Sequence, residues 1–361
     1  MKLADIIETY ISGDWGEETV TEDTPNSVFC IRGADIVPIT NHCFDGIPQR
    51  FVCDKTKESK TLRAGDLIIE KSGGSPTQST GRIVYVSDDL IKAKGDVVCS
   101  NFCAAFRVKS DWNPLYVYYY WQNVYNHGAF FNFEGKTSGI KNLQLDNALA
   151  AIEIEYLPLE EQNRIASVLS AIDDKMKVNR RINDNLEAMA KQLYDYWFVQ
   201  FDFPNEEGKP YKSSGGEMVW NEKLKREIPK GWDVVNYMSL FEIGNGKTIP
   251  QTKGVIPAFG GNGIVKMIAE ANYSPCVIIG RVGANCGSIH YSKVPCWVSD
   301  NAIAVCPLNG NWLPFVYYSL SLYDLSKNRG GSSQPLITHA TLKNLYFAIS
   351  NVESTLKSGF V

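Results

Sequence analysis

Pro158-Leu-Glu-Glu-Gln-Asn-Arg-Ile-Ala166 and Trp197-Phe-Val-Gln-Phe-Asp-Phe-Pro204 enclose the stretch of this chain that decides its fold. Between them apolar residues recur every three or four positions, with the polar Asn179 standing between Met176 and Ile182, which places them on one face of a helix. We call this face the seam; it consists of Ile165, Leu169, Ile172, Met176, Ile182, Leu186, Met189 and Leu193. The spacing predicts one continuous helix over residues 158–204.

Both ends of this stretch carry helix signals. Pro158 and the carboxylates of Glu160 and Glu161 suit a first helical turn, and Pro204 is expected to end the helix. About 40 residues at roughly 1.5 Å each would form a rod on the order of 60 Å long. Such a rod exceeds the usual helix of a compact domain, so its seam needs a partner.

The segments on either side of the helix repeat the same features in the same order, at an offset of roughly 200 residues. The features are a strand entering a glycine turn, a second strand, an aromatic helix start and a polar glycine segment. The pairs are Ala64–Gly73 with Ser274–Gly283, Val98–Phe106 with Val298–Val305, Asn113–Trp121 with Asn311–Leu320, and Gly135–Leu143 with Gly331–Thr338. They favour a duplication over the alternative, two unrelated α+β domains with similar strand patterns.

This repeat, together with certain short motifs, resembles the specificity subunit of type I restriction-modification systems. The motifs are Pro158–Ile165, Leu186-Glu-Ala-Met-Ala190, Leu193–Asp202 and Ile228-Pro-Lys-Gly-Trp232. The resemblance implies an α+β fold in which two target-recognition domains, each a mixed curved sheet with flanking helices, are joined by a long coiled-coil spacer helix. It implies these segments: 1–157 first recognition domain, 158–204 spacer helix, 205–227 linker, 228–350 second recognition domain, and 351–361 a short tail.

In that family a second Pro-Leu-x-Glu-Gln helix normally follows the second recognition domain and lies antiparallel on the first. The sequence Ile349-Ser-Asn-Val-Glu-Ser-Thr-Leu-Lys-Ser-Gly-Phe-Val361 contains no such helix. The seam is therefore expected to lack its usual partner and to be exposed. Three outcomes stay open: docking on a partner subunit, pairing with a second copy of the chain, or a truncated product that acts poorly or serves as a sequence reservoir.

Composition bounds the function. The chain has 361 residues, enough for two cores, and a net charge of −4, so any DNA-binding surface must be local. No signal peptide and no apolar run of 18 or more residues is present, which predicts a cytoplasmic protein without membrane contact. The nine cysteines include no Cys-x-x-Cys pair and are expected to be free thiols.

Metal and catalytic motifs are weak. Cys276, Cys286, Cys296 and Cys306 recur every ten residues near His290, but they lie in apolar strand patterns without the short paired spacing of zinc sites. We expect no metal site and no cofactor in this chain. The four histidines, at positions 42, 127, 290 and 339, suggest no catalytic triad.

Three further motifs have simpler explanations. Asn113-Pro-Leu-Tyr116 is similar to a turn of amino-methyltransferases, but no cofactor-binding strand, turn and helix precedes it. It reads as a helix start. Phe259-Gly-Gly-Asn-Gly263 is predicted to form a tight loop. Asp45 with Glu58-Ser-Lys60 matches the loose spacing of a metal-dependent nuclease, but many sequences contain this pattern by chance.

The remaining chemistry is that of a DNA-binding surface. Cations, amides and hydroxyls on glycine-rich loops can contact base edges and phosphates. The candidates in the first half are Lys71, Ser72, Gln78, Arg82, Lys136, Ser138 and Lys141. Those in the second half are Lys247, Gln251, Lys253, Asn262, Arg281, Asn285 and Gln334.

The resemblance implies a non-catalytic subunit that binds a bipartite site in double-stranded DNA and positions methyltransferase and restriction-translocase subunits there. S-adenosylmethionine, ATP and Mg²⁺ would belong to those partners. Two alternatives stay open: a silent, truncated recognition cassette, and a stand-alone nuclease or methyltransferase with a hidden active site.

Overall fold

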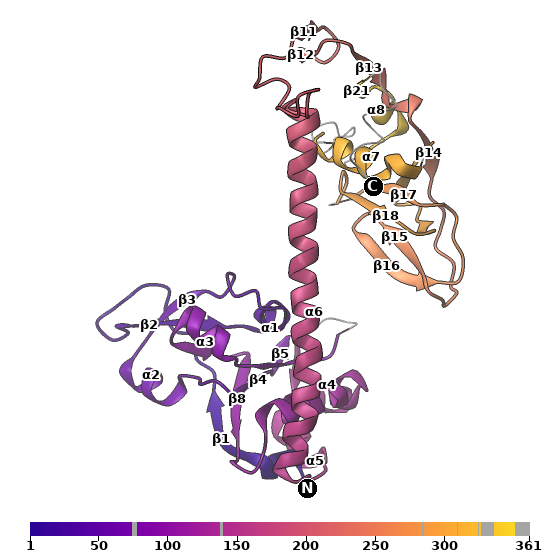
Figure 1. The fold of residues 1–361 in the computed structure, drawn as a ribbon. Helices are drawn as coiled ribbons and strands as arrows, with labels where there is room; N and C mark the ends of the chain where they lie inside the picture. The colour runs from indigo at the N-terminus through magenta and orange to yellow at the C-terminus, as the bar shows by residue number, and fades with distance from the viewer. Residues whose placement is uncertain are drawn as a thin grey trace. The chain divides into compact units, whose positions relative to one another are not determined.

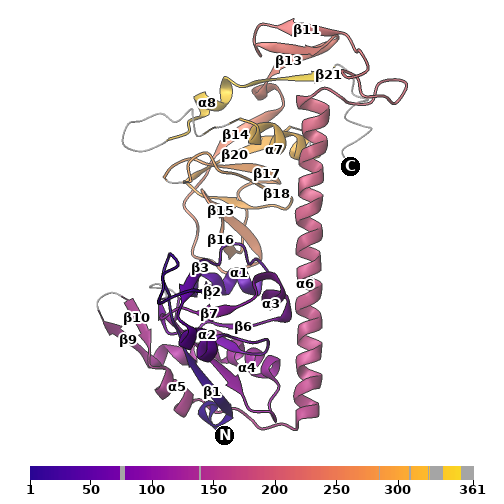
Figure 2. The same ribbon diagram turned by 90° about the vertical axis from the view of Figure 1, so that its left-hand side faces the viewer.

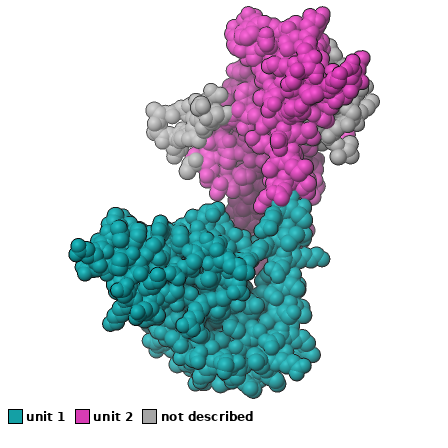
Figure 3. Space-filling view, turned by 60° about the vertical axis from the view of Figure 1, so that its left-hand side comes forward, with its two compact units in different colours: residues 1–183 teal, residues 184–361 magenta. Residues whose placement is uncertain are grey.

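The structure, a computed structural model, describes residues 1–73, 78–137, 140–283, 285–308, 310–323, 325 and 336–350. The chain divides into two compact units, Met1–Asn183 and Asp184–Val361, which Figure 3 shows in different colours. Each unit has its own buried apolar core. We refer to them as the first unit and the second unit.

The first unit is built on a four-stranded antiparallel sheet in the order β1-β8-β4-β6. A three-stranded sheet, β3-β2-β7, pairs β2 with β7 in parallel, and a third sheet has the order β5-β10-β9. The strands are β1 (Ile7–Ser12), β2 (Asn26–Ile31), β3 (Gln49–Val52), β4 (Leu67–Glu70), β5 (Ser72–Gly73), β6 (Ile83–Tyr85), β7 (Val97–Cys99), β8 (Cys103–Val108), β9 (Glu134–Thr137) and β10 (Ile140–Leu143).

Helices cover the sheets of the first unit. They are α1 (Ile36–Thr40), α2 (Asp54–Lys60), α3 (Asp88–Lys94), α4 (Pro114–Asn126) and α5 (Leu145–Ala151), with 3-10 turns η1 (Leu3–Ile6), η2 (Gly33–Asp35) and η3 (Ala129–Phe133).

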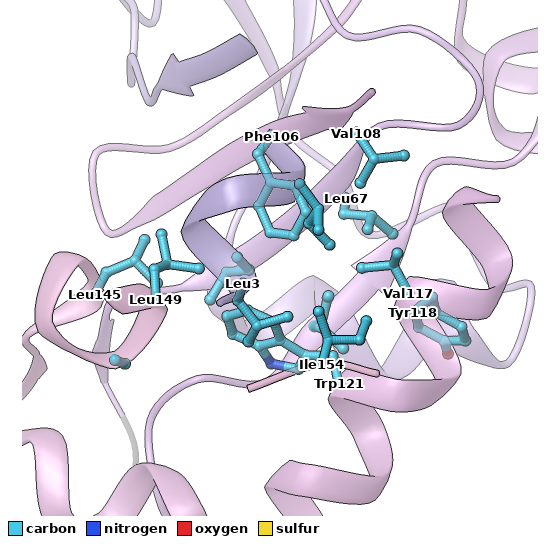
Figure 4. Close-up of a cluster of buried hydrophobic side chains, with 14 of the residues drawn as sticks. Leu3, Leu67, Phe106, Val108, Val117, Tyr118, Trp121, Leu145, Leu149 and Ile154 are labelled. Carbon is cyan, nitrogen blue, oxygen red and sulfur yellow. The ribbon is translucent and has the colours of Figure 1, made fainter. Parts of the chain in front are cut away.

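The central strand β4, Leu-Ile-Ile-Glu, is buried at every position because both of its faces are covered. Leu67 packs with Val117 and Trp121 of α4 in the core of Figure 4, whereas Ile68 packs in a second cluster on the other face.

The second unit repeats this plan. Its four-stranded antiparallel sheet has the order β14-β20-β17-β18, and in its three-stranded sheet, β16-β15-β19, β15 again pairs in parallel with β19. These strands are β14 (Phe241–Asn245), β15 (Ile256–Gly260), β16 (Gly263–Ile268), β17 (Cys276–Gly280), β18 (Ile289–Ser292), β19 (Trp297–Val298) and β20 (Ala302–Pro307).

Further elements complete the second unit. Two antiparallel ladders pair β11 (Met218–Asn221) with β12 (Arg226–Pro229) and β13 (Trp232–Asn236) with β21 (Tyr346–Ser350). The helices are α7 (Leu313–Ser321) and α8 (His339–Lys343), with 3-10 turns η5 (Tyr237–Ser239) and η6 (Gly310–Trp312).

The predicted α+β class with two similar sheet domains and one long helix is confirmed. Among the described residues, parallel pairing occurs in the sheets β3-β2-β7 and β16-β15-β19, whereas both four-stranded sheets are antiparallel throughout. The segment bounds predicted from the sequence stay predictions, and residues 351–361 lie outside the described part.

The long helix α6 runs from Leu159 to Tyr194 and continues as a π-helical turn, Asp195–Val199. It is unbroken in Figures 1 and 2, and no glycine or proline interrupts it. The expectation that Pro204 ends the helix was wrong. Phe201 already has a positive φ of 63°, which lies outside the right-handed helical region, and its buried ring holds the chain there.

The start of α6 is attached to the first unit by a buried glutamine. Gln162 is 0% exposed; its Oε1 accepts the Asn113 backbone N–H at 2.8 Å, and its Nε2 donates to the carbonyls of Leu157 at 2.8 Å and Asp111 at 3.2 Å. The Gln of the Pro-Leu-Glu-Glu-Gln motif thus satisfies buried backbone groups where α4 begins.

The end of α6 is attached to the second unit by aromatic packing. Tyr194 is buried, and its ring centroid lies 5.0 Å from that of Phe198, 5.7 Å from Phe315 and 5.8 Å from Tyr318. Offset and tilted rings at these distances stabilise the contact beyond their apolar area. The aromatic residues at the end of α6 therefore have a structural role.

Candidate nucleic-acid interface

In the first unit, several predicted DNA-binding residues meet where β4 ends. The backbone N–H of Lys71 donates to the carbonyl of Phe102 at 2.8 Å, and its carbonyl accepts the N–H of Leu143 at 2.7 Å. Ser72 Oγ donates to Asn142 Oδ1 at 2.5 Å. Lys71 is therefore held from both sides by backbone, while its ammonium group has no partner among the described residues.

Two other predicted cations of the first unit pair with buried carboxylates. Arg82 donates from Nε at 2.8 Å and Nη2 at 2.6 Å to Glu70, whose side chain is only 3% exposed. Hydrogen bonding to Glu70 raises the pKa of Arg82. Lys141 contacts the buried Glu134 at 3.3 Å and the carbonyl of Gln78 at 3.2 Å. Both cations offset buried charge, which removal of either would leave unpaired.

The remaining candidates of the first unit are Gln78, Lys136 and Ser138. Gln78 is exposed and contributes its backbone carbonyl to Lys141. Lys136 lies on β9 opposite Lys141, and nothing is described of its side chain. Ser138 lies outside the described residues.

In the second unit, Arg281 occupies the place of Lys71. Its N–H donates to the carbonyl of Asn301 at 2.9 Å and its carbonyl accepts the N–H of Ile337 at 3.0 Å. The Arg281 guanidinium has no partner among the described residues. Burial lowers the pKa of His339, with Arg281 and Lys343 adding to the shift, so positive charge gathers here.

Glycines bring backbone close together beside Arg281. A Cβ on Gly280 would lie 2.5 Å from the carbonyl oxygen of Asn285 and 2.6 Å from that of Gly261. Only glycine allows this approach, because it has no Cβ. This explains why the sequence has a glycine-rich turn at this position. Asn285 and Asn262 are exposed on the loops that converge at this point.

Three candidates of the second unit lie on the loop after β14. Lys247 is exposed; its N–H donates to the carbonyl of Val298 at 3.0 Å, and its carbonyl accepts Trp297 Nε1 at 3.0 Å. Gln251 Oε1 accepts Lys266 Nζ at 3.3 Å, and Lys253 is exposed. Gln334 lies outside the described residues.

The hydrogen bonds correct the register of the sequence repeat. Ser100 N–H donates to the carbonyl of Ile31 just as Ser299 N–H donates to that of Phe259, both at 2.9 Å. Ser100 therefore corresponds to Ser299, whereas the sequence comparison paired it with Asp300. The error of one residue hid the correspondence of Phe102 with Asn301, two residues absent from the predicted site.

The seam of α6 is largely exposed. Ile165 packs against the core of the first unit. The other seam residues are between 36% and 63% exposed, and comprise Leu169, Ile172, Met176, Ile182, Leu186, Met189 and Leu193. Exposed apolar residues in a row are typical of a surface that another helix covers.

The thiols show no metal geometry. None of the nine cysteines, all of which are described, is in a disulfide. Cys276 Sγ lies 3.7 Å from Cys296 Sγ, and hydrogen bonds with Cys296 and Cys306, along with burial, raise the pKa of Cys276. Across the described residues, no group of three or more His, Cys, Asp or Glu could hold a metal ion.

The two weak motifs with structural explanations behave as expected. Asn113 caps α4 by accepting the Tyr116 N–H at 3.1 Å, with Pro114 in the first turn. Gly261 and Asn262 form the turn between β15 and β16. Within the described residues, no helix is long and apolar enough to cross a membrane.

Comparison with known proteins gives a consistent result. A family model for the type I restriction modification DNA specificity domain matches residues 53–188 and 229–353. The type I restriction enzyme MjaIX specificity subunit of Methanocaldococcus jannaschii is 36% identical over 105 residues, which cover 29% of this chain and 22% of that one. The EcoprrI specificity subunit of Escherichia coli is 27% identical over 100 residues, which cover 27% and 25%.

The match to these curated relatives spans only about a quarter of their length. The comparison of structures covers a larger share of both chains. The crystal structure of a type I restriction-modification S subunit from M. genitalium aligns with 99% of this chain and 86% of that chain, with a TM-score of 0.54 and 16% sequence identity. At this identity the likeness shows a common fold.

Proposed function

We propose that this chain, which belongs to the family of type I restriction-modification DNA specificity domains, recognises the DNA target of a type I complex. It binds a bipartite site in duplex DNA and positions methyltransferase and restriction subunits there. The chain is not catalytic by itself in this role, and S-adenosylmethionine, ATP and Mg²⁺ are bound by the partner subunits.

The observation that carries this proposal is the repetition of one site in two units. Lys71 and Arg281 sit at the same hydrogen-bonded position, each at the end of a central strand and beside glycine turns. Cations on such turns suit phosphates and base edges. A chain with two versions of one site suits a target with two parts.

The seam of α6 supports partner docking. Its exposed side chains include Ile172 at 51%, Leu186 at 56% and Met189 at 63%. Burial of such residues contributes about 25 cal/mol per Å² of apolar surface. We assign this face to a helix of a methyltransferase subunit, with self-pairing of two chains as the alternative occupant.

Co-purification with the methyltransferase subunit encoded beside this chain tests the proposal, followed by mapping of methylated bases in DNA exposed to the complex. We expect a complex, a split target motif, and DNA binding that weakens steeply with salt as phosphate contacts release counterions. Leu186→Glu should prevent assembly, while Glu187→Gln, on the neighbouring exposed position, should not.

Two results would contradict the proposal. Cleavage or methyl transfer by the purified chain alone would make it an enzyme. A complex that forms but methylates no split motif would make it a silent cassette.

A further inference from the structure

In each four-stranded sheet, the ladder between the two central strands ends with the same backbone arrangement. In the first unit the β4–β8 ladder ends with Glu70 opposite Cys103, and in the second the β17–β20 ladder ends with Gly280 opposite Ala302. One step further, Lys71 donates its N–H to Phe102, and Arg281 donates to Asn301. Phe102 and Asn301 are each the third residue of a turn, which is closed by the N–H of Cys103 to the carbonyl of Ser100 at 2.8 Å and by that of Ala302 to Ser299 at 2.9 Å.

The side chains at these two positions are available for contact. Phe102 is 59% exposed, which is unusual for a phenylalanine, and Asn301 is exposed as well. Lys71 and Arg281 are half-buried, and their charged groups have no partner among the described residues. In contrast, the neighbouring Arg82 is held by Glu70.

The backbone at these positions is the same in both units, but the side chains differ. A third segment completes the frame, since the N–H of Leu143 and that of Ile337 donate to the carbonyls of Lys71 and Arg281. Beside it, the first unit has the bonded pair Ser72 and Asn142, while the second has an apolar bridge between Val282 and Leu336. Different side chains on one frame allow two related units to discriminate different bases.

We propose that Lys71 with Phe102, and Arg281 with Asn301, are equivalent specificity-determining pairs, each reading one half of the DNA target. The inference rests on the proposed function. Arg281 matches the O6 and N7 acceptors of guanine, and Asn301 matches the N6 and N7 edge of adenine. Lys71 also matches guanine, and the apolar ring of Phe102 matches the methyl group of thymine.

The test uses this chain in complex with its methyltransferase subunit and a pool of duplexes with randomised positions. Bound duplexes are sequenced, which reports base preference at each half-site separately. Arg281→Ala and Asn301→Ala should each relax discrimination at one base pair of one half-site by about 5- to 150-fold. The other half-site should be unchanged.

The exchange Lys71→Arg with Phe102→Asn gives the first unit the pair of the second. We expect the preference of the first half-site to move from thymine toward adenine next to a retained guanine. Arg281→Lys, a conservative variant, should keep a guanine preference while weakening it.

Asn101→Ala and Asp300→Ala are matched controls, because each alters the exposed residue just before the proposed one. The sequence repeat pairs Asn101 with Asn301, whereas the hydrogen bonds pair Phe102 with Asn301. An effect of Phe102→Ala without an effect of Asn101→Ala therefore supports the structural register, and the reverse overturns it.

Other outcomes are equally decisive. Uniform weakening on all sequences would mean phosphate contacts only and would overturn the inference, as would unchanged motifs in Arg281→Ala, Asn301→Ala and Phe102→Ala. Both results leave a wild-type split motif in place. Absence of a split motif with the wild-type chain would instead overturn the proposed function and the inference with it.

Discussion

The two units share a hydrogen-bond frame but fill its interior with different chemistry. In the first, Asp66 is fully buried and bonds Arg107 at 2.8 and 2.9 Å. The ladder registers place Cys276 and Cys306 at the corresponding positions of the second unit. A buried ion pair in one copy is thus replaced by two thiols in the other.

A second buried pair is replaced as well. Glu70 with Arg82 corresponds to Gly280 with Ser288, since both positions exchange the same backbone bonds. Arg82 Nη2 donates to the carbonyl of Gly33, and Ser288 Oγ donates to that of Gly261. The backbone contact is retained while the charge is not, which teaches that the frame of this fold does not depend on buried ion pairs.

The largest expected effect comes from breaking one of these ion pairs. Arg107→Ala strands the buried carboxylate of Asp66 and should destabilise the first unit by about 3 to 5 kcal/mol. Cys306→Ala, its counterpart, should cost about 1 kcal/mol. Hydrogen exchange by mass spectrometry, read on peptides of β4 and β17, measures each unit separately.

The double variant Asp66→Cys with Arg107→Cys sharpens this result. It gives the first unit the thiols of the second and should recover most of the lost stability. Equal losses in Arg107→Ala and the double variant would show that the ion pair itself is required.

The two ends of α6 also differ in chemistry, because polar hydrogen bonds hold its start and aromatic packing holds its end. Gln162→Ala removes the partners of three buried backbone groups and should cost about 3 kcal/mol, the upper end for a stranded buried group. The exposed Gln192 on the same helix gives the control Gln192→Ala. Thermal unfolding that shifts equally for both variants would argue against a structural role for Gln162.

The third comparison concerns Gly280 of the second unit, which corresponds to Glu70 of the first. Gly280→Ala places a Cβ against the carbonyls of Asn285 and Gly261, which are backbone atoms and yield little. We expect a loss of about 1 to 3 kcal/mol in the second unit, measured by urea unfolding. Gly283→Ala places its Cβ in open space and, unlike Gly280→Ala, meets a positive φ, of 79°, so a larger effect there would contradict the packing argument.

The smallest effect concerns pH. His290 pairs with Ile278 as Val84 pairs with Ile68, so valine is its counterpart. Burial lowers the pKa of His290. The unfolded chain therefore takes up a proton first as pH falls through about 6.5, and folded stability declines there.

His290→Val should remove this part of the decline, worth below about 1 kcal/mol. The measurement is urea unfolding at pH 7.5 and pH 5.5, compared between the wild-type chain and the His290→Val chain. His339 stays in both and accounts for part of the remaining slope, because its pKa is also lowered by burial. Parallel slopes in both chains would exclude His290 as a source of pH dependence.

The sequence predicted the fold better than the site. The strand Leu67–Glu70 and its echo Cys276–Gly280 could be paired because each is a local apolar run that leads into a glycine turn. Arg82 and Lys141 were indistinguishable from Lys71 by sequence, since all three are cations near glycines. Their buried partners, Glu70 and Glu134, are seen only when the strands are paired.

The one-residue error in the repeat has a related cause. Apolar strand patterns tolerate a slip, because Val98 and Val298 look equivalent whether or not their backbones occupy the same place. Hydrogen bonds do not tolerate it, since each N–H must meet one carbonyl. Phe102 and Asn301 therefore became candidates only from the bonded register.

By itself the sequence determined the long helix, the duplication and the family, because helical periodicity and the order of short motifs are properties of neighbouring residues. The tertiary structure decided which polar side chains are committed to buried partners and which stay available. That choice depends on contacts between segments far apart in the chain, such as Lys71 with Phe102 and Leu143, and no local pattern carries it.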